Sequence, residues 1–366
     1  MKPSPGNYLA ISVLLLFLFA PSLRATAAPP SVNNLDAKTQ LAVDRLQQWY
    51  NPQTGLWNHT GWWNSANALT ALVDFARVSG TTQYNGVIAQ TYTSANHAKP
   101  DFLNQYYDDE GWWALAWIDA YDLTGNKQYL GAAATIFQNM SGGWDQTCGG
   151  GLWWSKKRKY KNAIANELFL SVAAHLANRS DSASQRSYYL NWAIREWTWF
   201  RRSGMIERDH LISDGLTPQC TDNHRRKWSY NQGVILGGLA QLSQLPGRRR
   251  DLHDAQKIAN AATRRLTDRN GILHDACEPH CGGDGTQFKG IFVRNLADLY
   301  PLAPHAGWQR FILRNANSIL TNDQNPDHSF GVVWSGPPGP ANPSTQTSAL
   351  DALIAAIQLQ HHRSSP

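Results

Sequence analysis

The stretch EGWWALAWIDAYDLTGNKQYLGAAATIFQNM, residues Glu110–Met140, decides the fold. Apolar residues recur at helical spacing in Glu110–Leu123 and again in Lys127–Met140, which is the pattern of helices that bury one face. Only the short turn Thr124–Asn126 separates the two runs. The stretch therefore predicts a helical hairpin, in which two neighbouring helices run in opposite directions.

The same spacing recurs along the rest of the chain, whereas the strict alternation typical of strands is scarce. The sequence predicts twelve helices in all, so the expected fold class is all-α. In chain order the other ten are Leu35–Tyr50, Asn64–Val78, Tyr84–Asn96, Asn162–Ala177, Ser184–Arg201, Ser229–Leu245, Leu252–Leu266, Phe288–Tyr300, His305–Leu320 and Ser348–Gln360.

Long and short connections alternate between these helices. The long loops contain residues 51–63, 98–109, 141–161, 204–228, 267–287 and 321–347. The short turns lie at residues 80–81, 124–126, 178–183, 246–251 and 301–304. Strict alternation places all long loops at one end, and six hairpins closed into a ring form a double-walled (α/α)6 barrel. We expect one such domain over residues 28–366. An open α-solenoid is the alternative, but no fixed-period repeat supports it.

The N-terminus has the features of a secretory signal peptide over residues 1–27. Lys2 gives a positive start, Leu9–Ala20 is apolar, and Ala25–Ala27 offers a small-residue cleavage site. The apolar run is 12 residues long, whereas a membrane-spanning helix needs about 20, which disfavours an uncleaved anchor. The polar end QLQHHRSSP lacks the hydrophobic tail of a GPI signal. We expect a secreted, extracellular protein without a membrane anchor.

Composition excludes several classes of protein. With 42% hydrophobic and 16% charged residues, the chain is too apolar to be disordered. Removing residues 1–27 lowers the net charge from +6 to +4. The basic residues cluster at 156–159, 225–227 and 248–250, but aromatic residues are not interleaved with them as in RNA-binding modules. We therefore interpret these clusters as solvated loop charges, and we expect a monomer that binds no nucleic acid.

Four cysteines, Cys148, Cys220, Cys277 and Cys281, suggest two disulfides in a secreted chain, and three pairings are possible. Cys277 and Cys281 are four residues apart, so a small local loop is plausible, which would leave Cys148 to pair with Cys220. Zinc held by the second pair and its flanking histidines is the alternative. It is disfavoured because a second metal-type cysteine pair is missing and disulfides are favoured outside the cell.

The sixteen tryptophans are concentrated at one end of the predicted barrel. Ten of them lie in the long loops or one turn into the next helix: Trp57, Trp62, Trp63, Trp112, Trp113, Trp144, Trp153, Trp154, Trp228 and Trp334. Binding residues are disproportionately carried by loops on a rigid scaffold. We therefore expect a cleft that is floored by the barrel and walled mainly by these rings, suited to a flat, weakly polar ligand such as a sugar.

The strongest catalytic candidate is the pair Asp108 and Asp109 in the aromatic stretch YYDDEGWW, residues 106–113. Adjacent carboxylates resist ionising together, and apolar rings add to the cost of charge, so one group is expected to stay protonated near neutral pH. A glycosidase needs that division of roles: one carboxylate as nucleophile and one carboxylic acid that protonates the leaving oxygen. Helix capping is the alternative interpretation, because acids in a first turn accept backbone N–H bonds.

Other helix starts carry amides and rings of the kind that contact sugars. Asn162 and Asn166 share one helix face, Trp228–Gly233 opens one predicted helix, and Gln287–Gly290 opens another. Motifs of nucleotide-binding proteins, serine hydrolases and zinc proteases are absent from the sequence. We expect neither a metal nor a cofactor.

These residues carry a resemblance to glycoside hydrolase family 76, the endo-α-1,6-mannanases. The similar stretches are Trp63–Leu72, Tyr107–Tyr121, Gly149–Trp154, Tyr160–Leu168, Trp228–Gly237 and Phe288–Arg294. The resemblance implies an (α/α)6 fold and a retaining hydrolase with Asp108 as nucleophile and Asp109 as general acid/base. It implies binding of α-1,6-mannan or manno-oligosaccharides. The implied substrate-binding residues are Trp63, Asn67, Tyr107, Trp112, Trp153, Lys161, Asn162, Asn166, Tyr230, Asn231, Phe288 and Lys289.

Three alternative functions remain open at this point. Some members of the family resemble cell-wall transglycosylases, which pass the glycosyl group to a sugar rather than to water. A catalytically silent glycan-binding protein would use the same aromatic residues without releasing product. A different (α/α)6 hydrolase or lyase would act on another polysaccharide.

Overall fold

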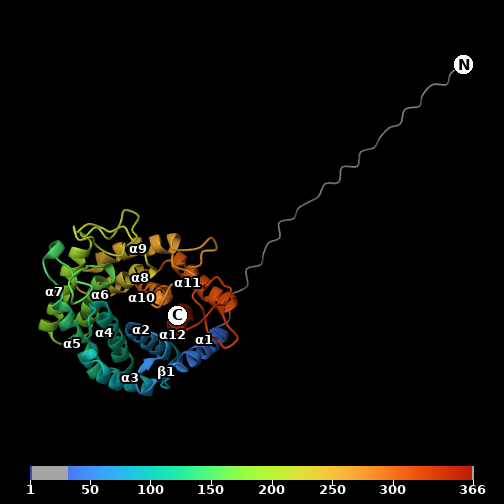
Figure 1. Cartoon of the computed structure of the whole chain (residues 1–366), viewed down its shortest axis with the longest axis horizontal. Helices are drawn as coiled ribbons and strands as arrows, with labels where there is room; N and C mark the ends of the chain where they lie inside the picture. Colours follow the sequence, from blue (N-terminus) through green and yellow to red (C-terminus); the bar gives the residue numbers. More distant parts are fainter. Residues whose placement is uncertain (2–31, 365–366) are drawn as a thin grey trace.

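The computed structural model describes Met1 and residues 32–364. The predicted signal peptide lies outside these residues. Within 32–364 the chain forms twelve α-helices in two concentric layers (Figure 1). The inner layer consists of α2 (Trp62–Ser79), α4 (Tyr107–Thr124), α6 (Ala163–Arg179), α8 (Ser229–Ser243), α10 (Phe288–Leu299) and α12 (Pro343–Ser364). The outer layer consists of α1 (Val32–Gln47), α3 (Asn85–Ala98), α5 (Lys127–Ser141), α7 (Ala183–Phe200), α9 (Leu252–Arg265) and α11 (Ala306–Ser318).

The inner helices form a closed ring. Each inner helix contacts the next one, and α12 contacts α2, so that no helix face is left open at the seam. This closure confirms the predicted (α/α)6 barrel and excludes the open α-solenoid. None of the helices in the described part of the chain is long and apolar enough to cross a membrane.

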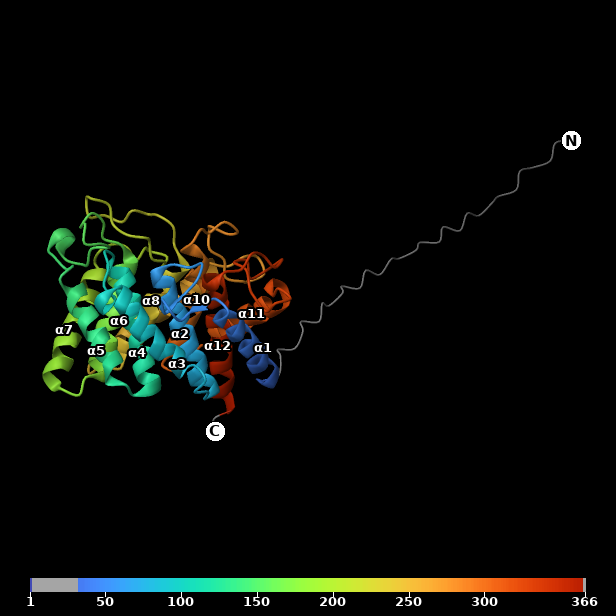
Figure 2. The same ribbon diagram turned by 60° about the horizontal axis from the view of Figure 1, so that its bottom comes forward.

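The long loops gather at one end of the barrel, as Figure 2 shows at the top of the view. Since each long loop follows an outer helix and leads into an inner one, all six inner helices begin at this end. The first long loop also contains a two-stranded antiparallel hairpin of β1 (Tyr50–Asn51) and β2 (Leu56–Trp57), in which Tyr50 pairs with Trp57. The barrel therefore presents six helix N-termini and the long loops on one surface.

Small residues allow the inner helices to approach closely. A Cβ atom on Gly233 of α8 would lie 2.5 Å from the Phe292 Cα of α10, and one on Gly290 of α10 would lie 2.5 Å from the Ser348 Cα of α12. Only glycine leaves room for backbone at that distance. These two positions explain why glycine occurs inside otherwise helical sequence, and they fix the spacing of α8, α10 and α12.

A network of buried charges crosses the inner ring. Arg294 of α10 donates to both carboxylate oxygens of Asp351 on α12, at 3.1 Å each, and to Asn67 Oδ1 on α2 at 2.8 Å. Burial raises the pKa of Asp351 and that of Asp119 on α4 to about 7. Burial likewise raises the pKa of Asp298 to about 6. The network therefore holds protons at mildly acidic pH, and its arginines balance the carboxylates that ionise.

Several predicted helix boundaries differ from the observed ones by three residues or more, and two of these differences have a clear cause. The twelfth helix begins at Pro343 rather than Ser348, because proline is tolerated in a first turn, where its missing N–H has no helical acceptor. The first helix ends at Gln47 rather than Tyr50, because Tyr50 joins β1 instead. The eleventh helix continues into a π-helical turn, Ile319–Asp323.

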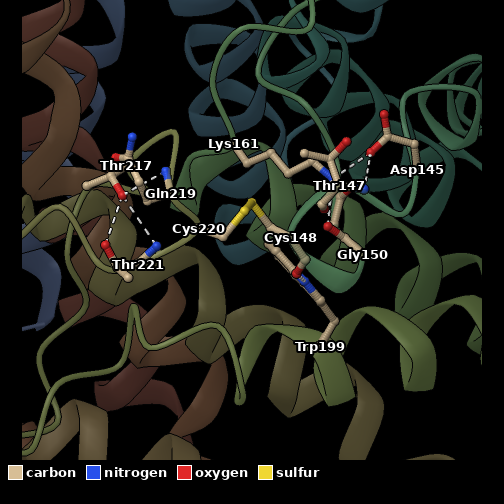
Figure 3. The surroundings of a disulfide bond; sticks show 11 residues. Asp145, Thr147, Cys148, Gly150, Lys161, Trp199, Thr217, Gln219, Cys220 and Thr221 are labelled. Carbon is tan, nitrogen blue, oxygen red and sulfur yellow. Dashed lines mark hydrogen bonds and ion pairs between the residues drawn. A yellow bond between two sulfur atoms is a disulfide. The ribbon is translucent and has the colours of Figure 1, made fainter.

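Both disulfides are present, as Cys148–Cys220 and Cys277–Cys281. The local pairing of Cys277 with Cys281 leaves no thiolate for zinc. The Cys148–Cys220 bond joins the loop after α5 to the loop after α7 (Figure 3). It therefore ties together two of the long loops at the end where the inner helices begin.

Removing the long-range disulfide should destabilise the protein far more than removing the local one. Cys148 and Cys220 are 72 residues apart, whereas Cys277 and Cys281 are 4 apart. Closing a longer loop removes more entropy from the unfolded chain, so we expect Cys148→Ser/Cys220→Ser to lower the free energy of unfolding by about 2–4 kcal/mol. Urea unfolding measures this loss of unfolding free energy, with Cys277→Ser/Cys281→Ser as the matched control. Equal losses in the two variants would contradict the loop-closure explanation.

Candidate active site

The aspartate pair lies in the first turn of α4, at the long-loop end of the barrel. Trp154 Nε1 donates to Asp108 Oδ2 at 2.9 Å, and Asn104 Nδ2 donates to Asp109 Oδ2 at 2.5 Å. Trp154 is positioned by its backbone, because its carbonyl oxygen accepts from the N–H of Tyr107 at 2.9 Å. Asp108 and Asp109, hereafter the dyad, therefore have separate hydrogen-bond donors from two different loops.

The surroundings of the dyad favour the protonated form of at least one carboxyl. Burial and the charge of Asp109 raise the pKa of Asp108 well above its usual value, against the donated bond from Trp154. Burial raises the pKa of Asp109 to about 6, with the charge of Asp284 adding to it and Asn104 opposing it. Because the two groups titrate as a pair, these values belong to the dyad rather than to either aspartate alone. The dyad can hold one proton near neutral pH.

Glu110, the third acid of the stretch, is structural. Its carboxylate is fully buried and accepts from Lys156 Nζ at 2.9 Å and Asn139 Nδ2 at 2.5 Å. The capping interpretation is not borne out as a hydrogen bond, because α4 has no side-chain cap and Asp108 Oδ1 has no hydrogen-bond partner among the described residues. Acids in the first turn of α4 still complement the helix dipole.

Four of the predicted substrate-binding residues form one aromatic row beside the dyad. Trp112 stacks on Trp63 with ring centroids 5.6 Å apart, Trp63 is 6.3 Å from Phe288, and Phe288 stacks on Tyr230 at 3.8 Å. Burial, followed by the charges of Asp214 and Asp108, raises the pKa of Tyr230. Trp63 and Tyr230 are partly exposed and remain candidates for contact with a sugar ring, whereas Trp112 and Phe288 are buried.

Four of the ten tryptophans expected to wall a cleft are buried instead. Trp57, Trp113 and Trp334 are at most 1% exposed, and Trp112 is 3% exposed. A loop position does not make a large ring accessible, because long loops that fold over a barrel need cores of their own. The partly or fully exposed members of the ten are Trp62, Trp63, Trp144, Trp153, Trp154 and Trp228.

Lys161 supports a loop instead of facing solvent (Figure 3). Its buried ammonium group donates to Asp145 Oδ1 at 2.9 Å and to the carbonyl oxygens of Thr147, Gly150 and Gly151 at 2.6–2.8 Å. These four acceptors leave it no donor for a ligand. We therefore do not propose Lys161 as a substrate-binding residue.

The same loop explains three more predicted residues. Trp153 Nε1 donates to Asp145 Oδ2 at 2.7 Å. Asn166 is fully buried and bonds to both the N–H and the carbonyl of Leu152, at 2.6 and 3.0 Å. Asn162 caps α6 by accepting from the Ala165 N–H. Their amides and indole shape the loop that carries Trp154, so their contribution to the site is indirect.

The remaining four predicted residues are also buried. Asn67 bonds to Arg294, and Lys289 pairs with Glu278 at 2.9 Å with both side chains 2% exposed. Tyr107 is 5% exposed. Neither amide atom of Asn231 has a hydrogen-bond partner among the described residues. The structure brings none of these four side chains into contact with the dyad carboxyls.

Sequence reasoning missed four residues of the site, and it predicted Trp154 only as one of the rings that wall a cleft. Asn104 and Trp154 hold the dyad, and Asp284 accepts from Trp63 Nε1 at 2.9 Å. Tyr160 donates to Asp214 Oδ2 at 2.5 Å beside the ring of Trp154. Trp154 and Tyr160 fall inside the stretches that carry the family resemblance, so that signal was available. Asn104, Asp214 and Asp284 lie in irregular loops with no periodic pattern to mark them.

The comparisons with known proteins agree with this geometry. The family model described as Glycosyl hydrolase family 76 matches residues 34–365. Mannan endo-1,6-alpha-mannosidase DFG5 of Candida albicans is 27% identical over 95% of this chain and 85% of that protein. Mannan endo-1,6-alpha-mannosidase DCW1 of Candida glabrata is 28% identical over 75% of this chain and 66% of that protein.

Solved structures share the fold. An inactive variant of the alpha-1,6-mannanase of Salegentibacter sp. HEL1_6, in complex with alpha-1,6-mannotriose, has a TM-score of 0.80 and 22% identity. The match covers 89% of this chain and 99% of that one, and the variant is substituted at two consecutive aspartates. Dfg5 from Chaetomium thermophilum, in complex with glucosamine, has a TM-score of 0.79 and 19% identity, covering 91% and 92% of the two chains.

Proposed function

The chain belongs to glycosyl hydrolase family 76, and on that basis we propose that it is a secreted endo-α-1,6-mannanase that acts with retention of configuration. The observation that carries the proposal is the dyad, two adjacent carboxyls in the first turn of α4 with separate donors and raised pKa values. The mannan-cleaving relatives and the inactive double-aspartate variant with bound mannotriose support the choice of substrate.

In the first step Asp108 attacks the anomeric carbon of the mannosyl unit. Asp109 donates its proton to the departing glycosidic oxygen, so that the leaving sugar departs as a neutral alcohol. The bond to the leaving oxygen breaks as the ester bond to Asp108 forms. The indole N–H of Trp154 holds the Asp108 carboxylate in place, and the Asn104 amide holds Asp109.

In the second step Asp109, now ionised, removes a proton from water as the water attacks the anomeric carbon. The ester bond to Asp108 breaks, and the product carries the original α configuration. Trp63 and Tyr230, the partly exposed rings of the aromatic row, supply apolar surface against which a pyranose ring packs. The exposed edge of Trp63 is held in orientation by its bond to Asp284.

A product time course on unbranched α-1,6-mannan tests the proposal. We expect a ladder of internal cleavage products whose first-formed anomer is α. Products longer than the substrate oligosaccharide would show transfer to a sugar in place of hydrolysis. Binding without any product would identify a glycan-binding protein, and cleavage of other polysaccharides alone would assign a different substrate.

Loss of the Trp154 indole donor should shift the pH profile of the enzyme. Trp154→Phe keeps a ring but removes the N–H that stabilises ionised Asp108, so the pKa of Asp108 rises. We expect the acidic limb of kcat/KM against pH to move to higher pH, and kcat/KM at the optimum to fall about 10- to 100-fold, the value of a hydrogen bond to a charged group.

Trp153→Phe is the matched control for this substitution, because the Trp153 indole donates to Asp145 rather than to the dyad. Its pH profile should stay where it is in the parent enzyme. If both variants move the acidic limb equally, the shift comes from disturbing the loop and not from the bond to Asp108.

A further inference from the structure

A pocket of about 350 Å³ opens among the long loops, and its lining includes Trp153 and Tyr160, which flank Trp154 in the loop that holds the dyad. It lies between the loop after α5 and the loop after α7, and its lining includes Cys148, whose disulfide to Cys220 joins these two loops (Figure 3). The polar side chains that matter here are Lys159, Tyr160 and Arg225. The disulfide fixes the two walls relative to each other, so the pocket is part of the rigid framework.

Two rings connect this pocket to the catalytic centre. Trp154, which donates to Asp108, meets Tyr160 edge to face with ring centroids 6.4 Å apart. The backbone carbonyl of Tyr160 also accepts from the Trp154 N–H at 2.8 Å. Tyr160 lines the pocket. A glycan bound at the dyad therefore has the pocket beside it, behind a single pair of rings.

The pocket lining contains three cationic side chains and no carboxylate. Of these, the Lys161 ammonium is fully engaged by Asp145 and three carbonyl oxygens. Lys159 and Arg225 are exposed, and neither forms an ion pair with any described residue. Their positive charges are therefore uncompensated, and they come from the two opposite walls.

Some neighbouring basic residues of the same two loops do have acidic partners. Lys156 pairs with Glu110 at 2.9 Å, and Arg158 lies 3.7 Å from Asp145. Lys227 pairs with Glu207. Lys159 and Arg225 are, like Lys157 and Arg226, cations of these loops without an ion pair among the described residues, and they differ from those two in that both line the 350 Å³ pocket.

Arg225 also lines a second pocket, of about 700 Å³, together with Arg226 and Trp228. The carboxylate in that lining, Asp214, already accepts the Tyr160 hydroxyl proton. The guanidinium of Arg226 lies 5.1 Å from the centre of the Trp228 ring. The positive charge of Arg225 therefore continues to Arg226 along this side of the site. Asp214, the carboxylate in this lining, already accepts a hydrogen bond from Tyr160.

We propose that the pocket between Lys159 and Arg225 binds a phosphate ester carried by the glycan that occupies the dyad. The inference rests on the proposed function and extends it from neutral mannan to phosphorylated mannan. A guanidinium presents paired donors that match phosphate oxygens, and a lysine adds a compact charge from the other side. One cation is enough to pair with a carboxylate. Two cations on opposite walls can bind different oxygens of a tetrahedral phosphate, and they therefore favour phosphate over a carboxylate.

Calorimetry with mannose 6-phosphate and with mannose tests the pocket directly on the full chain. We expect the phosphate to bind at least about tenfold more tightly than mannose at low salt, as charge-assisted bonds require, and to lose this advantage as salt rises. Lys159→Gln/Arg225→Gln should abolish the difference. Lys157→Gln/Arg186→Gln, which removes the same charge from exposed residues outside the pocket lining, should keep it.

Equal affinities for the two sugars, or equal losses in both double variants, would overturn the proposal. Tighter binding of glucuronic acid than of mannose 6-phosphate would overturn the choice of phosphate. A second experiment compares kcat/KM on phosphorylated α-1,6-mannan before and after phosphatase treatment. We expect a higher kcat/KM on the phosphorylated mannan. This preference should vanish in Lys159→Gln/Arg225→Gln but not in Lys157→Gln/Arg186→Gln. Failure to cleave either mannan refutes the proposed function, while the calorimetry still decides the pocket.

Discussion

Asp108→Asn and Asp109→Asn should each lower kcat on α-1,6-mannan by about 10³-fold or more, because each removes a group that takes part in bond making or proton transfer. The amide is nearly the same size as the carboxyl, so the fold should be retained. Asn104 and Trp154 remain able to donate to the amide oxygen. Near-native activity in either variant would refute the assignment of the dyad.

The two roles can be separated with an activated aryl α-1,6-mannotrioside and added azide. In Asp108→Ala, azide should enter the vacated space and displace the aryl group directly, which gives a β-mannosyl azide. In Asp109→Ala the good leaving group departs without acid help, Asp108 still forms the ester, and azide then gives the α-mannosyl azide. NMR of the isolated products distinguishes the two anomers.

The reverse pattern of anomers would exchange the roles of Asp108 and Asp109. There is a physical reason to test for exchanged roles. Burial raises the pKa of Asp108 well above the usual range, whereas it raises the pKa of Asp109 to about 6. Since the two carboxyls titrate as a pair, these directions do not fix which of them holds the shared proton in the free enzyme. The assignment of Asp108 as nucleophile requires the bound sugar and its developing positive charge to favour ionised Asp108, and the azide products test that requirement.

Arg294→Met should be the most damaging single substitution for stability. Arg294 balances Asp351 through two bonds of 3.1 Å inside the inner ring. Removing one member of a buried ion pair leaves an uncompensated charge and costs about 3–5 kcal/mol. We expect a loss of that size in urea unfolding, whereas Arg310→Met, on the exposed face of α11, should change stability by less than about 0.5 kcal/mol.

The loss in Arg294→Met should depend on pH in a defined direction. Burial raises the pKa values of Asp119 and Asp351 to about 7. Carboxyls with raised pKa values favour the folded state when protonated, and this stability is lost as pH rises through the folded-state pKa. The variant should therefore lose less stability at pH 5 than at pH 8. Arg294→Met/Asp351→Asn should recover part of the loss, and a pH-independent loss with no recovery would contradict the ion-pair explanation.

Much of the fold could be predicted from sequence because helical spacing and loop length are local signals. The alternation of long and short connections was enough to place all six inner helix starts at one end, and the ring of contacts confirms it. The dyad was recognisable for the same reason, since two adjacent acids among aromatics stand out in any sequence. The first turn of α12 was missed because it begins with Pro343 and lacks an apolar repeat.

The supporting residues could not be assigned from sequence, because their roles depend on contacts between distant segments. Lys161 and Lys289 look like substrate-binding lysines in a helix-start motif, yet Lys161 bonds to carbonyl oxygens earlier in its own long loop and Lys289 bonds to Val332 O in another loop. Asp284 lies 221 residues from the Trp63 indole that it holds. No local pattern marks such a partner, and only the closed barrel brings the two together.

The closure of the ring has a consequence for folding during synthesis. The seam joins α2, the first inner helix to be made, to α12, the last one. Until α12 leaves the ribosome, α2 and α10 each keep one apolar side without its native cover, and the contacts that complete the ring span nearly the whole chain, which makes them slow to form. Where several chains are made close together, α12 of one nascent chain can pack equally well against α2 and α10 of another. Exchange of this helix between two copies is therefore the misassembly to which the architecture is most exposed.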